Sequence, residues 1–112
     1  EAAKGLKDAC AFSKPVRDYK EQVFYHDMPD GEVVATLENK KIGIELYIKY
    51  NKKELPEFIE WKMTGEGTYV LGLEPANCRV EGRDKERQKG TLQFLNPGEE
   101  RIISLEIGVK SI

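Results

Sequence analysis

The run Lys41-Ile42-Gly43-Ile44-Glu45-Leu46-Tyr47-Ile48-Lys49 alternates in side-chain character more cleanly than any other part of the chain. Its four aliphatic residues fall on one face of an extended strand, and its charged residues and tyrosine fall on the other. Residues 32–38 place Val33, Ala35 and Leu37 on one face in the same way. Because only a short polar segment separates the two runs, we predict that they pair as an antiparallel hairpin.

Outside this hairpin, short alternating segments are separated by turn-forming residues. We predict further strands at residues 22–26, 58–63, 69–74, 90–95 and 101–109. The last strand is expected to turn its apolar residues inward: Ile103, Leu105, Ile107 and Val109. Residues 77–89 are rich in charge and are expected to form an exposed loop, and residues 1–15 to be loosely ordered or a short helix. Seven short strands with little helix predict an all-β fold, an antiparallel β-sandwich that forms a single region over residues 1–112.

The composition excludes several classes of function. Hydrophobic residues make up 39% of the 112 residues and charged residues 34%, and the net charge is −2. The chain therefore lacks the basic footprint expected of a nucleic-acid-binding protein. No apolar run approaches the roughly 18 residues of a membrane span. Cys10 and Cys78 lie far apart without metal-binding spacing, which favours two reduced thiols in a cytoplasmic protein over a disulfide.

The segment from Tyr69 to Pro75 predicts a strand that ends in a carboxylate beside open space. Alternation places Gly72 and Glu74 on the same face, and Gly72 removes the side chain that would crowd the acid. Pro75 then ends ladder hydrogen bonding. Glu74 is a candidate general base, because apolar strand neighbours would desolvate it and raise its pKa. The alternative is an exposed glutamate at a strand end that forms a salt bridge, and the residues alone favour that interpretation.

Other polar and aromatic residues give weaker signals. His26 is the only histidine; it could contact a ligand, or it could be an ordinary edge-strand residue. Trp61 could stack on a sugar ring, although its place in the stripe Ile59, Trp61 and Met63 is more typical of a core residue. Arg83 belongs to a group of three loop arginines that could bind a polyol or an anion, or could be solvated charge. No metal site or nucleophile motif is predicted.

Several segments together resemble the C-terminal part of an uncharacterised bacterial branch of the aldose 1-epimerase, or galactose mutarotase-like, family. The resemblance covers the chain from about Pro15 onward, and its most specific element is the run Gly72-Leu73-Glu74-Pro75-Ala76-Asn77. The other matching segments are Glu21-Gln22-Val23-Phe24-Tyr25-His26-Asp27, residues 50–56, residues 61–71, Glu81-Gly82-Arg83, residues 95–99 and residues 105–108.

The resemblance implies a β-supersandwich that binds a hexose or a related sugar and interconverts its anomers by acid/base ring opening, without a metal or organic cofactor. Glu74 matches the catalytic base of that family, and Trp61, Asn77 and Arg83 are expected ligand contacts. The family's mid-chain histidine acid has no counterpart in residues 1–112, so the chain is expected to be a C-terminal fragment that is inactive alone and self-associates through open sheet edges. A non-catalytic carbohydrate-binding module and a structural β-sandwich module are the alternatives.

Overall fold

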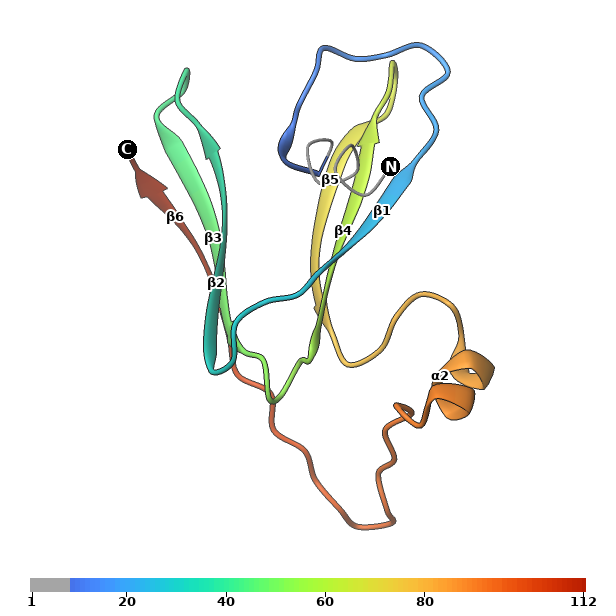
Figure 1. The fold of residues 1–112 in the computed structure, drawn as a ribbon. Coiled ribbons are helices and arrows are strands. Elements are labelled where there is room, and N and C mark those ends of the chain that lie inside the picture. The colour runs from blue at the N-terminus through green and yellow to red at the C-terminus, as the bar shows by residue number, and fades with distance from the viewer. Residues whose placement is uncertain (1–8) are drawn as a thin grey trace. The chain divides into compact units, whose positions relative to one another are not determined.

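The computed structural model describes residues 9–112 and shows an all-β fold with two antiparallel sheets of three strands (Figure 1). One sheet has the order β1-β4-β5 and the other the order β2-β3-β6. The elements are β1 (Gln22–His26), β2 (Glu32–Asn39), β3 (Ile44–Asn51), β4 (Glu57–Thr64), β5 (Tyr69–Ala76), α2 (Arg83–Lys89) and β6 (Leu105–Ser111). The predicted all-β class is confirmed.

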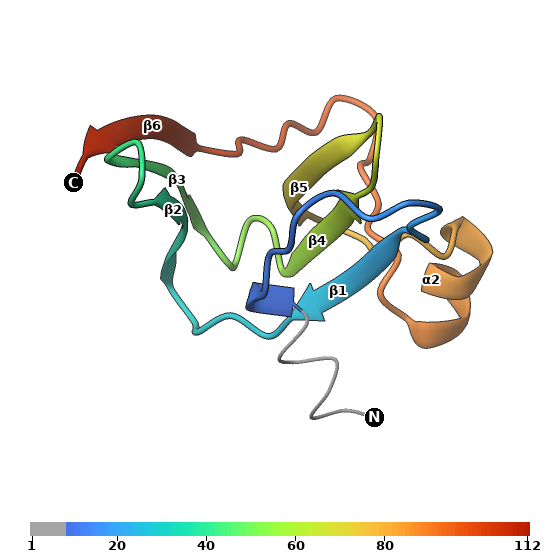
Figure 2. The ribbon, with the colours of Figure 1, turned by 90° about the horizontal axis from the view of Figure 1, so that it is seen from above.

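The chain divides into two compact units. The first takes in the described residues up to His26 together with Phe58–Glu74, and it holds nearly all of the β1-β4-β5 sheet. The second takes in Asp27–Glu57 and Pro75–Ile112, and it holds the β2-β3-β6 sheet and α2. Each sheet can be followed separately in Figure 2, where β4 lies between β1 and β5.

In the first unit, the segment before β1 is fastened to the end of β4. β1 and β4 pair antiparallel from Gln22↔Lys62 to His26↔Phe58. The Val16 N–H donates to the Thr64 carbonyl over 3.1 Å, and the Glu66 N–H donates to the Val16 carbonyl over 3.0 Å. These two bonds form a short parallel bridge, so the chain before β1 is held against the sheet by backbone hydrogen bonds rather than by side chains alone.

In the second unit, the predicted hairpin is present and carries much of the core. β2 and β3 pair antiparallel along their whole length, from Glu32↔Asn51 to Asn39↔Ile44. Cross-strand partners point to the same face of a sheet, so the apolar positions of both strands form one continuous face. The buried residues of this face are Val33, Ala35, Ile48 and Tyr50. Gly43, with φ of 69°, supplies the left-handed conformation in the connection.

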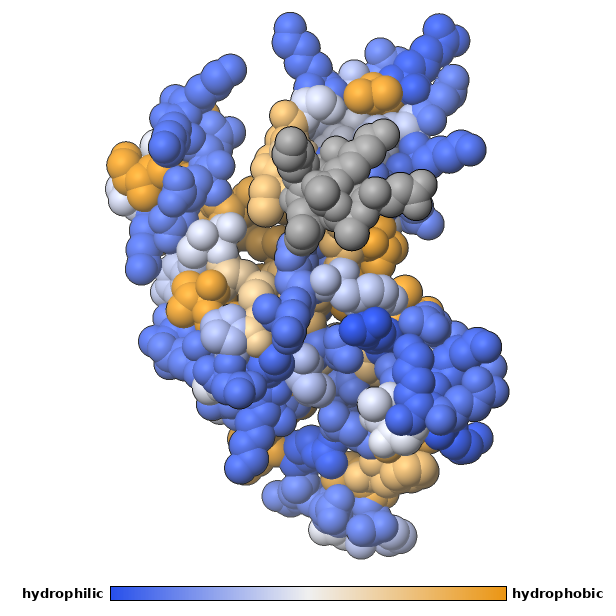
Figure 3. Space-filling model, in the orientation of Figure 1, coloured by the Kyte–Doolittle hydropathy of each residue, from blue (hydrophilic) through white to orange (hydrophobic). Residues whose placement is uncertain are grey.

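The prediction for the last strand is partly wrong. β6 pairs with β3, but it spans Leu105–Ser111, so Ile103 lies outside it. The side chains of Ile107 and Val109 are 63% and 64% exposed instead of buried. The physical reason is position: β6 is an edge strand, and only its β3 side is paired. Figure 3 shows apolar residues as separate patches on a largely hydrophilic surface.

Residues 77–95 also differ from the prediction. The charged segment expected to be a loop contains α2, and residues 90–95 form no strand. Asp84 and Glu86 lie in the first turn of α2 and Lys89 lies in the last, which is the arrangement that complements the helix dipole. The N–H groups of Thr91 and Leu92 donate to the Glu86 carbonyl, so this backbone completes the helix end instead of joining a ladder.

Most of the predicted N-terminal helix lies outside the described residues, although Ala9 and Cys10 are helical. Among residues 9–112, no helix combines the length and apolarity that crossing a membrane requires.

Candidate functional site

The predicted space beside Glu74 exists, and the carboxylate of Glu74 occupies it. A Cβ built on Gly72 would lie 2.6 Å from Oε1 of Glu74 and 3.3 Å from the Cβ of Trp61 on β4. The Glu74 side chain therefore folds back over the glycine, toward the strand that carries Trp61. Because β4 and β5 are neighbours, the sheet brings the carboxylate of Glu74 and the Cβ of Trp61, 13 residues apart in the sequence, to the same glycine.

Trp61 is held by a polar contact as well as by packing. Its Nε1 donates a hydrogen bond to Oε2 of Glu21 over 2.7 Å, and Val23 of β1 lies opposite it in the ladder. The indole is half-buried instead of belonging fully to the core. Since a hydrogen bond to a carboxylate fixes the plane of the ring, Trp61 presents a defined aromatic surface.

Glu74 itself is exposed, and this corrects the environment expected from the sequence. Its neighbours along β5, Leu73 and Pro75, are only half-buried. A catalytic role for Glu74 would therefore depend on a bound ligand that excludes water from the carboxylate.

Gly72→Ala tests the importance of this gap. The new Cβ would displace the flexible end of Glu74, so the carboxylate is expected to move away from Trp61 while the strand stays intact. Stability should change by less than about 1 kcal/mol, because alanine suits a strand interior better than glycine does. Ligand affinity or activity at this face should fall. Urea denaturation measures stability, and a variant that keeps full function would show that the position of the carboxylate is unimportant.

Asn77 and Arg83, the other predicted ligand contacts, belong to the second unit. Both line a hollow of about 300 Å³ that Glu86 and Leu92 also border. The structure thus groups Trp61 with Glu74 in one unit, and Asn77 with Arg83 in the other.

Glu86 organises the hollow beside Arg83. Although it belongs to a helix of charged residues, it is only 4% exposed. Its Oε1 accepts a hydrogen bond from the Arg79 backbone N–H over 2.6 Å, and its Oε2 accepts one from the Thr91 hydroxyl. The Thr91 hydroxyl, and next the Arg79 N–H, lower the pKa of Glu86 because both donors stabilise the charged carboxylate.

This contact gives the second unit a predictable response to acid. A carboxylate whose folded pKa is lowered contributes stability above its unfolded pKa of about 4.5, and that contribution disappears as the pH falls through the lower folded value. We expect the NMR amide signals of Arg79 and Thr91 to shift together under acid. Glu86→Gln should remove this acid response, whereas the exposed control Glu100→Gln should retain it. An unchanged acid response in the Glu86 variant would contradict the assignment.

The opposite face of β4 carries a feature that the sequence interpretation missed. Glu60, Lys62 and Thr64 alternate along β4 and are 5%, 5% and 1% exposed. We call these three residues the polar row. The sequence assigned the neighbouring stripe to the core, but of that stripe Ile59 is buried whereas Trp61 and Met63 are only half-buried. The sequence did contain a signal for this row. Three polar residues at alternate positions of a strand must share one face of the sheet.

His26 pairs with Glu60, at the opposite end of the polar row from Thr64. Its Nε2 lies 2.8 Å from Oε1 of Glu60, and its ring meets Phe58 edge-on with centroids 5.9 Å apart. The side chain of Glu60 is 6% exposed and that of His26 is 26% exposed. The arrangement gives the buried carboxylate a partner that solvent can still reach.

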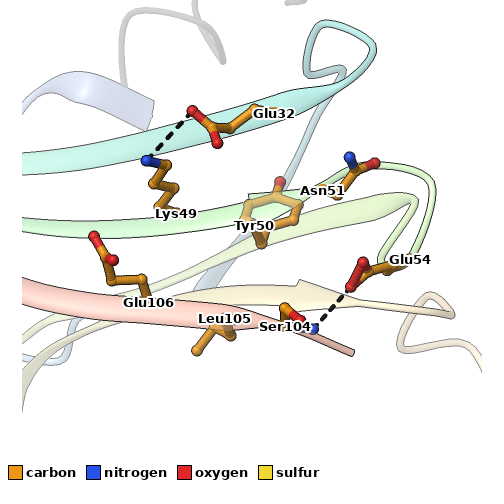
Figure 4. Close-up of a pocket in the computed structure, with 8 residues that line it drawn as sticks. All are labelled: Glu32, Lys49, Tyr50, Asn51, Glu54, Ser104, Leu105 and Glu106. Carbon is orange, nitrogen blue, oxygen red and sulfur yellow. Dashed lines mark hydrogen bonds and ion pairs between the residues drawn. The ribbon is translucent and has the colours of Figure 1, made fainter. Parts of the chain in front are cut away.

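A separate hollow of about 440 Å³ lies at the end of the β2-β3-β6 sheet (Figure 4). Its charged residues largely interact with neighbours: Lys49 pairs with Glu32 over 3.5 Å, and Glu54 accepts the Ser104 backbone N–H over 2.8 Å. Burial raises the pKa of Tyr50, which also lines it. No group of three metal-ligating side chains occurs among residues 9–112. This hollow therefore offers no converging set of reactive groups.

The family of the chain follows from its sequence match. Residues 1–109 match the family model described as a domain of unknown function, DUF4432. No match was found among curated proteins or among solved structures. Because the family model spans almost the whole sequence, the chain belongs to the DUF4432 family.

Proposed function

We propose that this chain forms the carbohydrate-binding part of an aldose 1-epimerase-like protein, with Glu74 as the general base. The observation that carries the proposal is the position of Glu74 Oε1, folded over Gly72 on the face that bears Trp61. An aromatic residue and a carboxylate on the same face match the chemistry of a sugar, which has an apolar C–H face and a rim of hydroxyl donors. The resemblance of residues 72–77 to aldose 1-epimerases points to the same carboxylate.

The proposed reaction needs only proton transfer. Glu74 removes the proton of the anomeric hydroxyl, the electron pair forms a carbonyl, and the bond between C1 and the ring oxygen breaks. The ring oxygen takes a proton from a general acid, which the resemblance does not place on residues 1–112. Rotation of the aldehyde and ring closure then give the other anomer. The proposal includes no metal or organic cofactor.

The partner is then a small sugar, a hexose or a derivative, in a cytoplasmic protein that binds neither nucleic acid nor membrane. The net charge of −2 supports the exclusion of nucleic acid, because a chain with that charge lacks the basic surface that phosphates require. For Asn77 and Arg83, which belong to the second unit, a role as ligand contacts stays a prediction from the sequence.

Trp61 provides the binding test, because it is the only tryptophan in the chain. Titration with galactose, glucose and mannose should give a saturable change in tryptophan fluorescence for at least one sugar. Trp61→Ala, studied by calorimetry, should weaken that binding by about 1 kcal/mol or more, the scale of an aromatic contact. If no common aldose binds saturably, both sugar-based functions fail and a structural module remains.

A carbohydrate-binding module without catalysis is the second candidate, and the exposure of Glu74 favours it. Such a module would retain the Trp61 face and would bind sugar without changing the rate of anomer exchange. Polarimetry on a freshly dissolved anomer separates the two, since only an epimerase accelerates the approach to equilibrium.

Self-association through β6 is the remaining proposed partnership. An antiparallel pair of β6 strands centred on Gly108 would place Glu106 opposite Lys110 of the second copy and Ile107 opposite Val109 of that copy. Each β6 edge would therefore place opposite charges against each other and apolar side chains against each other. Sedimentation velocity should show a dimer that Ile107→Lys disrupts, and a monomer at all concentrations would exclude this pairing.

A further inference from the structure

A hollow of about 440 Å³ lies in the first unit, at the Thr64 end of the polar row. One side is formed by Lys62 and Thr64 of β4, and the other by residues from the segment 11–22, including Ser13, Tyr19 and Lys20. The hollow is separate from the Gly72 gap, because the odd-numbered residue Trp61 and the polar row project from opposite faces of β4.

The hydroxyl of Thr64 is the first observation that points to a ligand. Thr64 is 1% exposed, and its Oγ1 has no hydrogen-bond partner among the residues that the structure describes. Native proteins rarely leave a buried hydroxyl unsatisfied, because its lost hydration is not replaced. Because Thr64 also lines the hollow, its unpaired hydroxyl is a candidate donor or acceptor for a molecule that enters it.

Positive charge is the second observation. Lys62 is 5% exposed; its ammonium donates to the Ala11 carbonyl and lies 5.3 Å from the centroid of the Phe12 ring. Lys20 also lines the hollow. Glu21 is the carboxylate among the lining residues, and it accepts the hydrogen bond from Trp61. Two ammonium groups and a hydroxyl donor favour an anion over a neutral polyol.

The wall of the hollow is formed before any ligand arrives. The Tyr69 hydroxyl donates to the Ser13 carbonyl over 2.6 Å, and the Tyr19 hydroxyl donates to Oε1 of Gln22 over 2.5 Å. Val16 adds the backbone bridge to the end of β4. Since these contacts fix the segment against the sheet, binding requires little reordering of the chain.

We propose that this hollow binds a small oxyanion, a phosphate or a carboxylate, with the Thr64 hydroxyl donating to an anionic oxygen and Lys62 supplying the compensating charge. The site is distinct from the Trp61 face and goes beyond the function proposed above. The oxyanion is either a free ion or a charged group on a larger ligand, and both present the same oxygens to Thr64.

The test is a set of NMR titrations of the chain in a buffer free of phosphate and carboxylates. Inorganic phosphate and acetate should each shift the amide signals of Lys20, Gln22 and Thr64 saturably, and their affinities should show which oxyanion fits. Glycerol, a neutral molecule with hydroxyl groups, should leave those signals unchanged. Equal binding of glycerol and phosphate would overturn the anion assignment, and shifts spread over all surface lysines would show screening instead of a site.

Two variants and one control test which side chains bind the oxyanion. Thr64→Val keeps the shape of the side chain and removes the hydroxyl, so phosphate affinity should fall about tenfold or more while the fold is retained. Lys20→Gln changes only an exposed residue and should weaken phosphate binding severalfold, and Lys14→Gln is its matched control because Lys14 does not line the hollow. If phosphate binds equally well to all three variants, the proposal is wrong, and the two lysine variants decide the question even if Thr64→Val does not fold.

Discussion

Replacing Glu74 by glutamine is expected to lower the rate of anomer interconversion by about 10²–10⁴-fold in the natural protein that contains these residues. Glutamine keeps the size and hydrogen-bonding capacity of the side chain but cannot accept the proton of the anomeric hydroxyl. Sugar affinity should change little, because Trp61 and the shape of the Gly72 gap remain. Polarimetry on a freshly dissolved anomer gives the rate, and tryptophan fluorescence gives the affinity.

The matched control for that experiment is Glu66→Gln. Glu66 is an exposed glutamate in the turn before β5, so its replacement changes the net charge identically without touching the Trp61 face. A loss of rate in both variants would indicate a general electrostatic effect. A Glu74 variant with the parental rate would refute the assignment of the base and leave the carbohydrate-binding module as the better explanation.

The second large effect is expected at the pair formed by His26 and Glu60. His26→Leu would leave the carboxylate of Glu60, whose side chain is 6% exposed, without the partner that now lies 2.8 Å away. We expect this change to lower the free energy of unfolding by roughly 3 kcal/mol, because an unpaired buried charge is costly. Urea denaturation at neutral pH, followed by the fluorescence of Trp61, measures the loss.

The companion variants decide whether pairing is the cause. Glu60→Leu removes the buried charge itself and leaves the more exposed His26, so its cost should be smaller than that of His26→Leu. The double variant with leucine at both positions should recover much of the stability lost in His26→Leu. Strictly additive losses would show that the two side chains act independently and that the pair has no special role.

The parts of the fold that were predictable are those in which local pattern and pairing agree. Residues 41–49 alternate cleanly and a short connection joins them to β2, so the hairpin follows from the sequence, although only Ile48 of the four aliphatic residues reaches the core. The Gly72 gap was predictable for a similar reason. Residues two apart on a strand share a face, so a missing side chain there must leave space for its neighbour.

The errors arose where burial depends on contacts from distant parts of the chain. Glu60, Lys62 and Thr64 alternate along β4 with the apolar stripe that begins at Ile59. Polarity alone predicted that the apolar stripe would face the core and that the three polar residues would face solvent, but the polar residues are buried. The buried state of Lys62 depends on the carbonyl of Ala11, 51 residues away, which no local pattern reveals. α2 was missed because seven charged and polar residues resemble a loop unless the Gly90 cap and the Thr91 contact are known.

Glu21 gives the first unit a property that neither proposed site has alone. One of its carboxylate oxygens accepts a hydrogen bond from the indole of Trp61, and the same residue lines the hollow that Thr64 also lines. A ligand in either place would act on one shared side chain, and thermodynamic reciprocity requires that any change in affinity be equal in both directions. The emission of Trp61 would therefore report on ligands at both proposed sites. Sugar titrations with and without phosphate would give two sugar affinities, and their ratio would give the coupling free energy between the two sites.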